Sequence, residues 1–342
     1  MANSEKTQIF VFLIPELSMV TLEEIQQPIA DKVRHYENFI TEILHSDSAY
    51  VSSICNYILS HRGKQMRPLL VLLSAALHGE IDTYSYLGAS LVEMMHTASL
   101  IHDDVVDEAF VRRGAPSVNA LWRSHTAVLI GDYIFARTYH VCMEKGGNDM
   151  LLEITRSVHE MSEGELIQTE QSENLRMTRE LYLDIIYKKT ASLLAACSAI
   201  GAISVKAPEE QIAAMRAYGT NLGIAFQIKD DILDYSPMEV TGKPMCGDMR
   251  ERKITLPLLY VLGNCSETEH RKLIGKLSDI RQKPDNVEYL ARTVRERGGL
   301  EHAAEVMAQY RDKALASLES YPDSPIRESL RKLAYFVLER NK

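Results

Sequence analysis

The chain has 342 residues, of which 46% are hydrophobic, so it is long and apolar enough to form one large domain with a substantial core. Its formal net charge is −9 and it has no block of basic residues, which disfavours nucleic-acid binding. The five cysteines show no C-x-x-C spacing. This argues against a disulfide framework or a zinc site and favours a reducing cytoplasm.

The N-terminal segment contains an apolar run at residues 9–14 that is too short to span a membrane. It lacks the basic start and the small-residue cleavage site of a signal peptide. We therefore predict that residues 1–18 form a dispensable tail and that residues 19–342 form a single domain, with Met19 as a candidate natural start. Deletion of the tail should preserve stability and activity, measured by thermal denaturation and by assay.

Residues 22–44 carry apolar side chains at helical spacing, with Pro28 in the first turns, where proline is tolerated. A second helix is predicted over residues 48–60, with Gly63 beyond it as a C′ glycine. Pro68 then begins a third helix.

Two basic residues, Lys64 and Arg67, bracket the start of this third helix. Free N–H groups and the helix dipole favour anions at such a position. Without further motifs, an ordinary exposed basic turn would be the better explanation.

An acidic motif, Asp103-Asp104-x-x-Asp107, follows a mostly apolar run from residue 91 to residue 101. On a helix Asp103 and Asp107 share a face, and Asp104 lies beside it. Buried carboxylates so close together would repel one another, and a hard cation such as Mg²⁺ would relieve that repulsion. Arg112 and Arg113 follow, and paired guanidinium groups suit phosphate oxygens.

Upstream of this motif, Glu93 and His96 form an E-x-x-H pair of the kind found in di-iron helical bundles. Such bundles need two pairs, and the sequence has no second one on a matching helix. As a bare pattern, His96 is more often a hydrogen-bonded core histidine than a ligand.

Long apolar helices are predicted over residues 119–142, 151–169 and 181–203. Asp132, in the first of them, is expected to be a structural partner. Lys189 and Thr190 lie inside the third, where a lysine between apolar residues would need an anion.

A second acidic motif, Asp230-Asp231-x-x-Asp234, ends another apolar segment, from residue 222 to residue 232. Two such motifs behind two core-like helices are much less expected by chance than one. We predict that they face each other across a cavity and bind a polyphosphate through Mg²⁺ ions.

The segment from residue 236 to residue 253 is rich in glycine, proline and charge, and is predicted to be a mobile loop. Helical patterns return between residues 258 and 338, with a break at Gly298-Gly299. The whole chain is therefore predicted to be all-α.

Five motifs resemble, in the same order, those of the trans-isoprenyl diphosphate synthases, the head-to-tail polyprenyl synthases, from about Gly63 to the C-terminus. They are Gly63-Lys64-Gln65-Met66-Arg67-Pro68; the first aspartate motif with Arg112-Arg113-Gly114; Lys189-Thr190; Phe226-Gln227 with the second aspartate motif; and Gly242-Lys243-Pro244 through Asp248 and Lys253 to Thr255-Leu256-Pro257. One departure is Cys246, because the family usually has glycine at this position. The resemblance implies the isoprenoid synthase fold, a single large helical bundle around a central cavity.

The resemblance also implies roles for individual residues. Lys64, Arg67, His96 and Arg113 would bind the diphosphate of isopentenyl diphosphate, and Arg112 would serve the allylic diphosphate. Lys189, the carbonyl of Thr190 and Gln227 would stabilise the developing carbocation. Lys243 and Lys253 would contact diphosphate, with Lys243 on a lid. The six aspartates of the two motifs would bind about three Mg²⁺ ions per active site: Asp103, Asp104, Asp107, Asp230, Asp231 and Asp234.

Ala98 and Ser99 precede the first aspartates by about one helical turn and are predicted to point into the cavity that holds the growing chain. In short-chain members of the family bulky aromatics occupy these positions. The small residues here predict a deeper floor, near Phe135 or Tyr139 of the facing helix. They also predict an all-trans product of roughly C30–C50, as expected of an octaprenyl-type synthase.

Several alternatives remain open. The product could be short, farnesyl or geranylgeranyl diphosphate, or the chain could be the catalytic subunit of a heteromeric synthase. A class I terpene cyclase would carry a different second metal motif, and a non-catalytic partner subunit would have lost aspartates or basic residues that this chain keeps. A cytoplasmic homodimer is the family's usual state, and the product would be passed to a membrane.

Overall fold

The computed structural model describes residues 20–237 and 245–339. The predicted tail, residues 1–18, lies outside these ranges, and so does Lys243. Within them the chain is almost entirely helical, which confirms the all-α prediction. The sequence analysis did not predict the short antiparallel hairpin of β1 (Val111–Arg112) and β2 (Ala115–Pro116).

The helical elements, in chain order, are α1 (Leu22–Gln26), η1 (Gln27–Ile29), α2 (Ala30–Ile43), α3 (Ala49–Ser60), α4 (Met66–His78), α5 (Thr83–Val106), α6 (Val118–Glu144), α7 (Asn148–Asn174), α8 (Arg179–Ile186), η2 (Tyr187–Ala191), α9 (Ser192–Ser204), α10 (Glu209–Leu233), α12 (Gly247–Arg250), α13 (Leu256–Gly263), α14 (Glu267–Ser278), α15 (Asn286–Glu296), α16 (Gly299–Ala316) and α17 (Pro325–Glu339).

Side-chain caps help to determine where many of these helices begin. A serine, threonine or aspartate side chain accepts a hydrogen bond from a free N–H of the first turn, which would otherwise lack a partner. The capping residues are Thr21, Ser48, Asp82, Ser117, Thr178 and Ser266. Gly298, whose φ is +75°, separates α15 from α16 as predicted, because glycine adopts the left-handed region without strain.

Three predicted helices depart from regularity. The first is divided by the 3₁₀ turn η1 around Pro28, which lacks an N–H for the helical ladder. In α6 the backbone of Arg123 leaves the helical region, with φ +68° and ψ 160°. The helix predicted over residues 181–203 contains the π-helical segment η2, and such segments frequently occur at functional sites. Lys189 and Thr190 both lie in η2.

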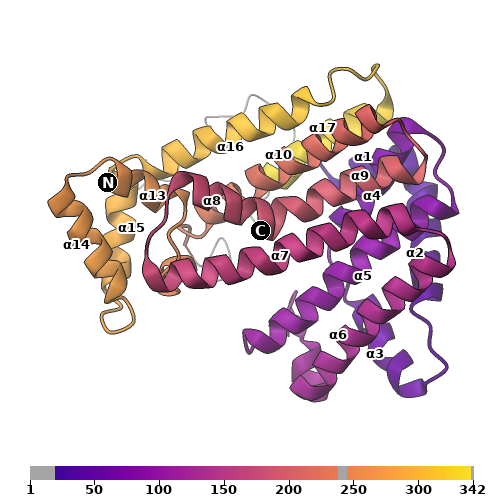
Figure 1. Ribbon diagram of the computed structural model, residues 1–342, viewed down its shortest axis with the longest axis horizontal. Coiled ribbons are helices and arrows are strands. Elements are labelled where there is room, and N and C mark those ends of the chain that lie inside the picture. The colour runs from indigo at the N-terminus through magenta and orange to yellow at the C-terminus, as the bar shows by residue number, and fades with distance from the viewer. Residues whose placement is uncertain (1–19, 238–244, 340–342) are drawn as a thin grey trace, which may run out of the picture.

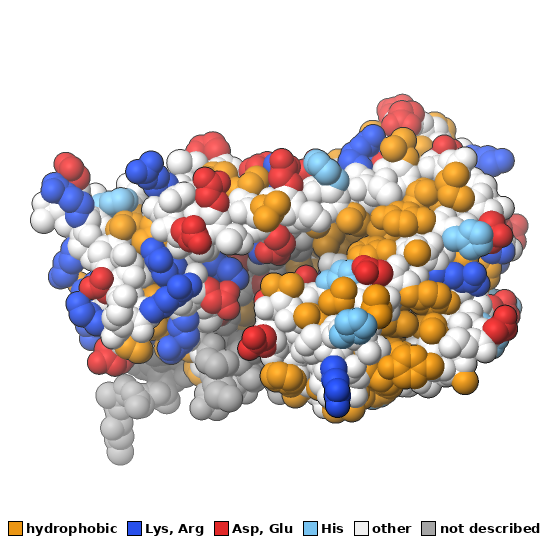
Figure 2. Space-filling view, turned by 60° about the horizontal axis from the view of Figure 1, so that its bottom comes forward, with side chains coloured by type: hydrophobic (Ala, Val, Ile, Leu, Met, Phe, Trp, Pro, Cys, Tyr) orange, Lys and Arg blue, Asp and Glu red, His pale blue; other side chains and the backbone are white. Residues whose placement is uncertain are grey.

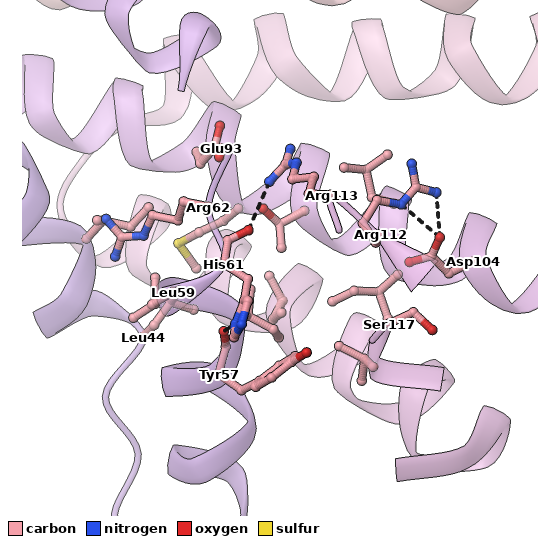
Figure 3. Close-up of a pocket in the computed structure, with 18 of the residues that line it drawn as sticks. Leu44, Tyr57, Leu59, His61, Arg62, Glu93, Asp104, Arg112, Arg113 and Ser117 are labelled. Carbon is pink, nitrogen blue, oxygen red and sulfur yellow. Dashed lines mark hydrogen bonds and ion pairs between the residues drawn. The ribbon is translucent and has the colours of Figure 1, made fainter. Parts of the chain in front are cut away.

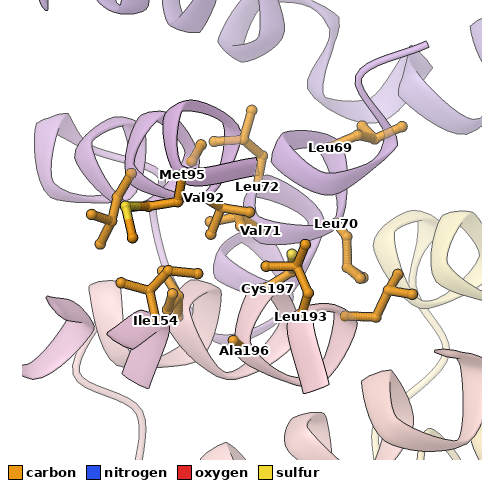
Figure 4. Packing of buried hydrophobic residues seen from close by; sticks show 14 of the residues in the cluster. Leu69, Leu70, Val71, Leu72, Val92, Met95, Ile154, Leu193, Ala196 and Cys197 are labelled. Atoms are coloured by element: carbon orange, nitrogen blue, oxygen red, sulfur yellow. The ribbon is translucent and has the colours of Figure 1, made fainter. Parts of the chain in front are cut away.

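The core is centred on α9, which packs against α4, α7 and α10 (Figure 1). Every residue of α9 from Ser192 to Ala202 is buried, so this helix has no exposed face over that stretch. Figure 4 shows how side chains of α4, α5, α7 and α9 pack together, with Val71, Val92 and Cys197 among them. This close-packed centre fixes the helix ends that carry the predicted site.

A smaller hydrophobic cluster lies at the other end of the molecule, where residues of α12 to α15 pack around Leu277 and Leu290 (Figure 1). The short helix α12 lies in the part of the predicted loop that the structure describes, so the prediction of a loop throughout residues 236–253 was wrong there. Cys246 and Met249 join the cluster and hold this part of the chain in place.

No helix in the described ranges has both the length and the apolar character that crossing a membrane requires.

Candidate active site

The predicted basic residues come together at the N-terminus of α4. The turn before this helix places Gly63 so close to Arg113 of the hairpin that a Cβ on Gly63 would lie 2.8 Å from the guanidinium carbon. Gly63 does not have the left-handed backbone expected of a C′ glycine, so that detail of the prediction was wrong. Gln65 has it instead, with φ +49°, and a side chain at position 63 would displace the end of the Arg113 side chain.

His96 and Glu93 lie beneath this cluster, on the buried side of α5. Burial lowers the pKa of His96 well below its usual value, and the charges of Arg67 and Arg113 lower it further. A neutral imidazole can still donate one hydrogen bond to an anion. Burial raises the pKa of Glu93, while Arg67, Arg113 and Arg62 oppose that rise. Positive charge therefore exceeds negative charge here, as a diphosphate site requires.

A cavity of about 70 Å³ opens beside these residues, between α2, α3, α5 and α6. Figure 3 shows Arg112 bonded to Asp104 at one end of this cavity, Arg62 at the other end, and Arg113 between them. Arg113 donates to the carbonyl of His61 at 3.5 Å. The sequence analysis gave no anion-binding role to Arg62, although it adjoins the Gly63-Lys64 turn.

The first aspartate motif divides into two parts. Asp103 and Asp107 lie at the surface, whereas Asp104 is 4% exposed. One oxygen of Asp104 accepts two hydrogen bonds from Arg112, one from Nε at 2.9 Å and one from Nη2. The carboxylate of Asp104 is therefore buried and bonded to Arg112, whereas those of Asp103 and Asp107 are at the surface. It also pairs Arg112 with Asp104, a contact that the sequence analysis did not anticipate.

The charge of Glu165 of α7 acts on Asp103 of the first motif and on Lys253, and the sequence analysis missed this residue. Partial desolvation, and then the charges of Glu165 and Asp107, raise the pKa of Asp103 to about 6. Glu165 also forms an ion pair with Lys189 at 3.0 Å, and its charge acts on Lys253. Lys253 in turn lies 3.9 Å from the carboxylate of Asp248, whose charge acts on Asp231 and Asp234 of the second motif. This is a tertiary arrangement with no local sequence signal.

In the second motif, Asp230 is partly exposed and Asp234 holds the segment that follows α10. The Asp234 carboxylate accepts from the N–H of Gly247 at 2.8 Å and from the N–H of Asp248 at 3.2 Å, at the start of α12. Burial, and then the charge of Asp248, raises the pKa of Asp234 to about 6. Cys246, where the family usually has glycine, has a left-handed backbone with φ +58°, and its side chain is buried in the smaller cluster.

Thr190, Gln227 and Asp231 form one hydrogen-bonded row from η2 to α10. The Thr190 hydroxyl donates to Gln227 Oε1 at 2.6 Å, and Gln227 Nε2 donates to Asp231 Oδ1 at 3.0 Å. Tyr182 of α8 donates to the other oxygen of Asp231 at 2.6 Å. Burial, and then the charge of Asp248, raises the pKa of Asp231 to about 8, while the two donors oppose that rise. Asp231, predicted as a metal ligand, is therefore buried with both oxygens bonded to protein groups.

Comparison with known proteins identifies the family of the chain. A family model described as "Polyprenyl synthetase" matches residues 48–294, well over half of the chain. The chain belongs to the polyprenyl synthetase family. It is a prenyltransferase.

Curated relatives of this polyprenyl synthetase match along almost its whole length. An all-trans-nonaprenyl-diphosphate synthase (geranyl-diphosphate specific) from Rhodobacter capsulatus is 34% identical, over 93% of this chain and 98% of the relative. Octaprenyl diphosphate synthase from Escherichia coli is 33% identical, over 94% of this chain and 100% of the relative. A short chain isoprenyl diphosphate synthase from Methanothermobacter thermautotrophicus is 36% identical, over 83% of this chain and 88% of the relative.

Solved structures share the fold. A polyprenyl synthase from Caulobacter crescentus, complexed with calcium and isoprenyl diphosphate, superposes with a TM-score of 0.84 at 33% identity, covering 96% of this chain and 100% of that one. A decaprenyl diphosphate synthase from Rhodobacter capsulatus gives a TM-score of 0.86 at 34% identity, covering 94% of this chain and 100% of that one. The predicted isoprenoid synthase fold is thereby confirmed.

The carboxylates of this polyprenyl synthetase fit a hard divalent cation by their chemistry. Asp103 and Asp234 both have pKa values raised by burial and by neighbouring carboxylates, a repulsion that a bound cation would relieve. Within the described ranges no three acidic, histidine or cysteine residues lie close enough together to hold a metal ion by themselves. Diphosphate oxygens are common additional ligands of Mg²⁺.

The predicted chain-length residues occupy neighbouring helices. Ala98 of α5 is completely buried, and Ser99 is partly exposed. Phe135 of α6 packs against His102 of α5, with ring centroids 5.6 Å apart. The floor residue proposed from the sequence therefore lies against the helix that carries Ala98.

His102, which directly precedes Asp103, is a further residue that the sequence analysis missed. Gly131 of α6 makes room for its imidazole, because a Cβ there would lie 2.6 Å from the ring carbon Cδ2. Its Nε2 lies 3.5 Å from a carboxylate oxygen of Asp132. Asp132 was expected to be a structural partner, and its carboxylate lies near His102.

Proposed function

We propose that this polyprenyl synthetase is an all-trans polyprenyl diphosphate synthase, a single-domain cytoplasmic enzyme that adds isopentenyl diphosphate to an allylic diphosphate in repeated head-to-tail condensations. The observation that carries the proposal is the basic cluster of Arg67, Arg113 and neutral His96, about two turns of α5 from Asp103. The basic cluster suits the diphosphate that is retained, and the acidic end of α5 suits the diphosphate that leaves.

The reaction would begin with cleavage of the allylic carbon–oxygen bond, whose electron pair departs with diphosphate. The isopentenyl double bond then attacks the allylic carbon, and the proton lost afterwards passes to the released diphosphate. Mg²⁺, when bound, supplies positive charge that stabilises the leaving diphosphate. Asp103, Asp107 and Asp230, with Asp234, would hold about three such ions.

The chain's own residues would position the reactants. Arg67, Arg113 and His96, with Lys64, would hold isopentenyl diphosphate. Lys64 lies over the ring of Phe336 at 5.5 Å, which places it between α4 and α17. Lys189, Thr190 and Gln227 would surround the developing cation with fixed charges and dipoles, the usual means by which enzymes stabilise such charge.

The direct test is incubation of the purified protein with isopentenyl diphosphate, Mg²⁺ and either farnesyl or geranylgeranyl diphosphate, followed by sizing of the products. We expect a product of roughly C30–C50. A product that stops at farnesyl or geranylgeranyl diphosphate would favour the short-chain alternative. Absence of any condensation would refute the proposal for the isolated chain.

A heteromeric enzyme is the second candidate, because the chain is 30% identical to heptaprenyl diphosphate synthase component 2 from Geobacillus stearothermophilus, over 92% of this chain and 97% of the relative. That relative is named as one component of a synthase. Activity of the isolated chain would exclude the need for a partner subunit.

The exposed face of α6 supports a homodimer. Five large hydrophobic residues on this face are each at least 37% exposed and recur at helical spacing: Leu121, Val128, Leu129, Tyr139 and Met143. Figure 2 shows hydrophobic side chains gathered on the half of the molecule that carries α6. Contiguous exposed apolar surface of this kind commonly marks a protein–protein interface. We propose that two copies pair through this face.

Leu129→Arg should convert the dimer to a monomer, because it places a charge in the middle of the apolar face. Light scattering after gel filtration measures the mass directly. Thr268→Arg, on the exposed surface of α14, adds the same charge far from this face and should leave the mass unchanged. A dimeric Leu129→Arg variant would contradict this placement.

Ala98→Phe should shorten the product, because a bulky ring would raise the floor of the chain cavity. The position is completely buried, so we also expect a loss of stability of about 1–3 kcal/mol from overpacking. Ala89→Phe is the matched control, since Ala89 is equally buried in α5 but about two and a half turns away. It should cost similar stability without changing product length. Equal product lengths in all three proteins would refute the placement of the floor.

A further inference from the structure

Asp231 is almost completely surrounded by protein groups. It is 2% exposed, and Tyr182, which donates to its Oδ2, is 3% exposed. The Tyr182 oxygen is itself hydrogen-bonded to the backbone of Leu256, which leaves its O–H for the carboxylate. A buried carboxyl group with its donors in place is an anchor for the groups bonded to it.

Asp231 determines the direction of the hydrogen bonds beyond it. The carboxylate oxygen that faces Gln227 accepts, so the amide turns its NH₂ group toward it. Oε1 of Gln227 then faces Thr190 and can only accept, so the Thr190 hydroxyl donates. With Asp231 ionised, the reverse orientation of the amide would bring two acceptors together at the 3.0 Å separation of Gln227 and Asp231.

The backbone context of Thr190 is consistent with this direction. Hydroxyls inside helices commonly donate to a carbonyl four residues back, as Ser192 does to Lys188 at 2.7 Å. Thr190, in the π-helical η2, donates instead across to α10. Its proton is thereby directed to Gln227, and the lone pairs of its oxygen remain available. Thr190 and Gln227 are both partly exposed, whereas Asp231 is buried, so Thr190 is at the accessible end of the row.

We propose that Asp231 and Tyr182 are positioning residues that act through Gln227 to turn the lone pairs of the Thr190 hydroxyl, and not its proton, toward the developing allylic cation. The proposal rests on the proposed function. It gives Asp231 a role other than metal binding and gives Tyr182 a role in the reaction. An oxygen dipole that is fixed before the reaction stabilises a cation without further reorganisation.

The main variant is Asp231→Asn. Its new side chain keeps an oxygen for Tyr182 and presents an NH₂ group to Gln227, which forces the Gln227 amide to reverse. Gln227 would then donate to Thr190, whose hydroxyl proton would turn toward the substrate. We expect the single-turnover rate of one condensation to fall about 10–100-fold, with KM for both substrates and the Mg²⁺ dependence unchanged.

A double variant, Asp231→Asn with Gln227→Glu, restores the original direction. The introduced NH₂ group donates to one oxygen of the introduced carboxylate, and Thr190 donates to the other. We expect most of the lost rate to return. Gln227→Glu alone places two buried carboxyl groups against each other and should be slower than the double variant.

Two further results decide the proposal. If the folded Asp231→Asn protein needs more Mg²⁺ for half-maximal rate and the double variant restores nothing, Asp231 acts as a metal ligand and the proposal is overturned. If Asp231→Asn does not fold, Tyr182→Phe replaces it: we expect a several-fold slower condensation at unchanged KM, and an unchanged rate overturns the proposal. An inactive unmodified protein would instead count against the proposed function itself.

Discussion

Asp103→Ala should lower the rate of condensation by about 10³-fold or more while leaving the fold intact. The carboxylate lies at the surface at the end of α5, where the negative charges of Glu165 and Asp107 act on it. Its removal relieves their repulsion, so no loss of stability is expected. The reaction slows because the Mg²⁺ that would stabilise the leaving diphosphate loses one of its ligands.

The measurement is a steady-state assay with both substrates, paired with a thermal denaturation of the same preparation. Glu80→Ala is a suitable control, since it also removes an exposed carboxylate, just before the other end of α5. The ion-pair partner of Glu80 is Lys32. It should leave the rate unchanged. Near-normal turnover of the Asp103→Ala protein would exclude Asp103 from the metal site.

Much of the fold was readable because the signals are local. The apolar run before Asp103 predicted a buried helix, and the structure places α5 there from Thr83 to Val106. The start of α4 was readable for the same reason, since Pro68 and the residues around it lie within a few positions of each other. Such patterns depend on helical spacing and end-group chemistry alone.

The sequence did not predict which carboxylate of each aspartate motif is buried and bonded to protein groups. In each motif the second carboxylate is buried and bonded to protein groups, Asp104 to Arg112 and Asp231 to Tyr182. Helical geometry places that residue about 100° from the face shared by the other two. Whether this direction points inward depends on neighbouring helices and on the hairpin that carries Arg112, which are tertiary features. Glu165 escaped prediction for the same reason, because only packing brings α7 close to Asp103 and to Lys253.

Gly201→Ala should destabilise the protein by roughly 2–3 kcal/mol and lower its Tm by about 3–6 °C. Gly201 allows α9 to approach α4 closely: a Cβ there would overlap the carbonyl oxygen of Val71 and lie 2.9 Å from the backbone N of Ala75. These are backbone atoms of a buried helix, so they cannot rotate away as a side chain would. The two helices must separate to admit one methyl group.

Gly275→Ala is the matched control, because the same substitution in α14 meets nothing within 4 Å. There alanine should stabilise the protein by about 0.5–1 kcal/mol, since it restricts the unfolded chain and favours the helix. Thermal denaturation of the two variants beside the unmodified protein measures both effects.

The effect of Gly201→Ala should also reach the active site. Arg67 lies at the start of α4, and η2, with Thr190, leads directly into α9. Separation of α4 from α9 would therefore move the diphosphate cluster away from the groups that face the cation, and KM for isopentenyl diphosphate should rise. Equal stability of the Gly201→Ala and Gly275→Ala variants would show that α4 and α9 can accommodate a methyl group between them, and that their contact does not set the geometry of the site.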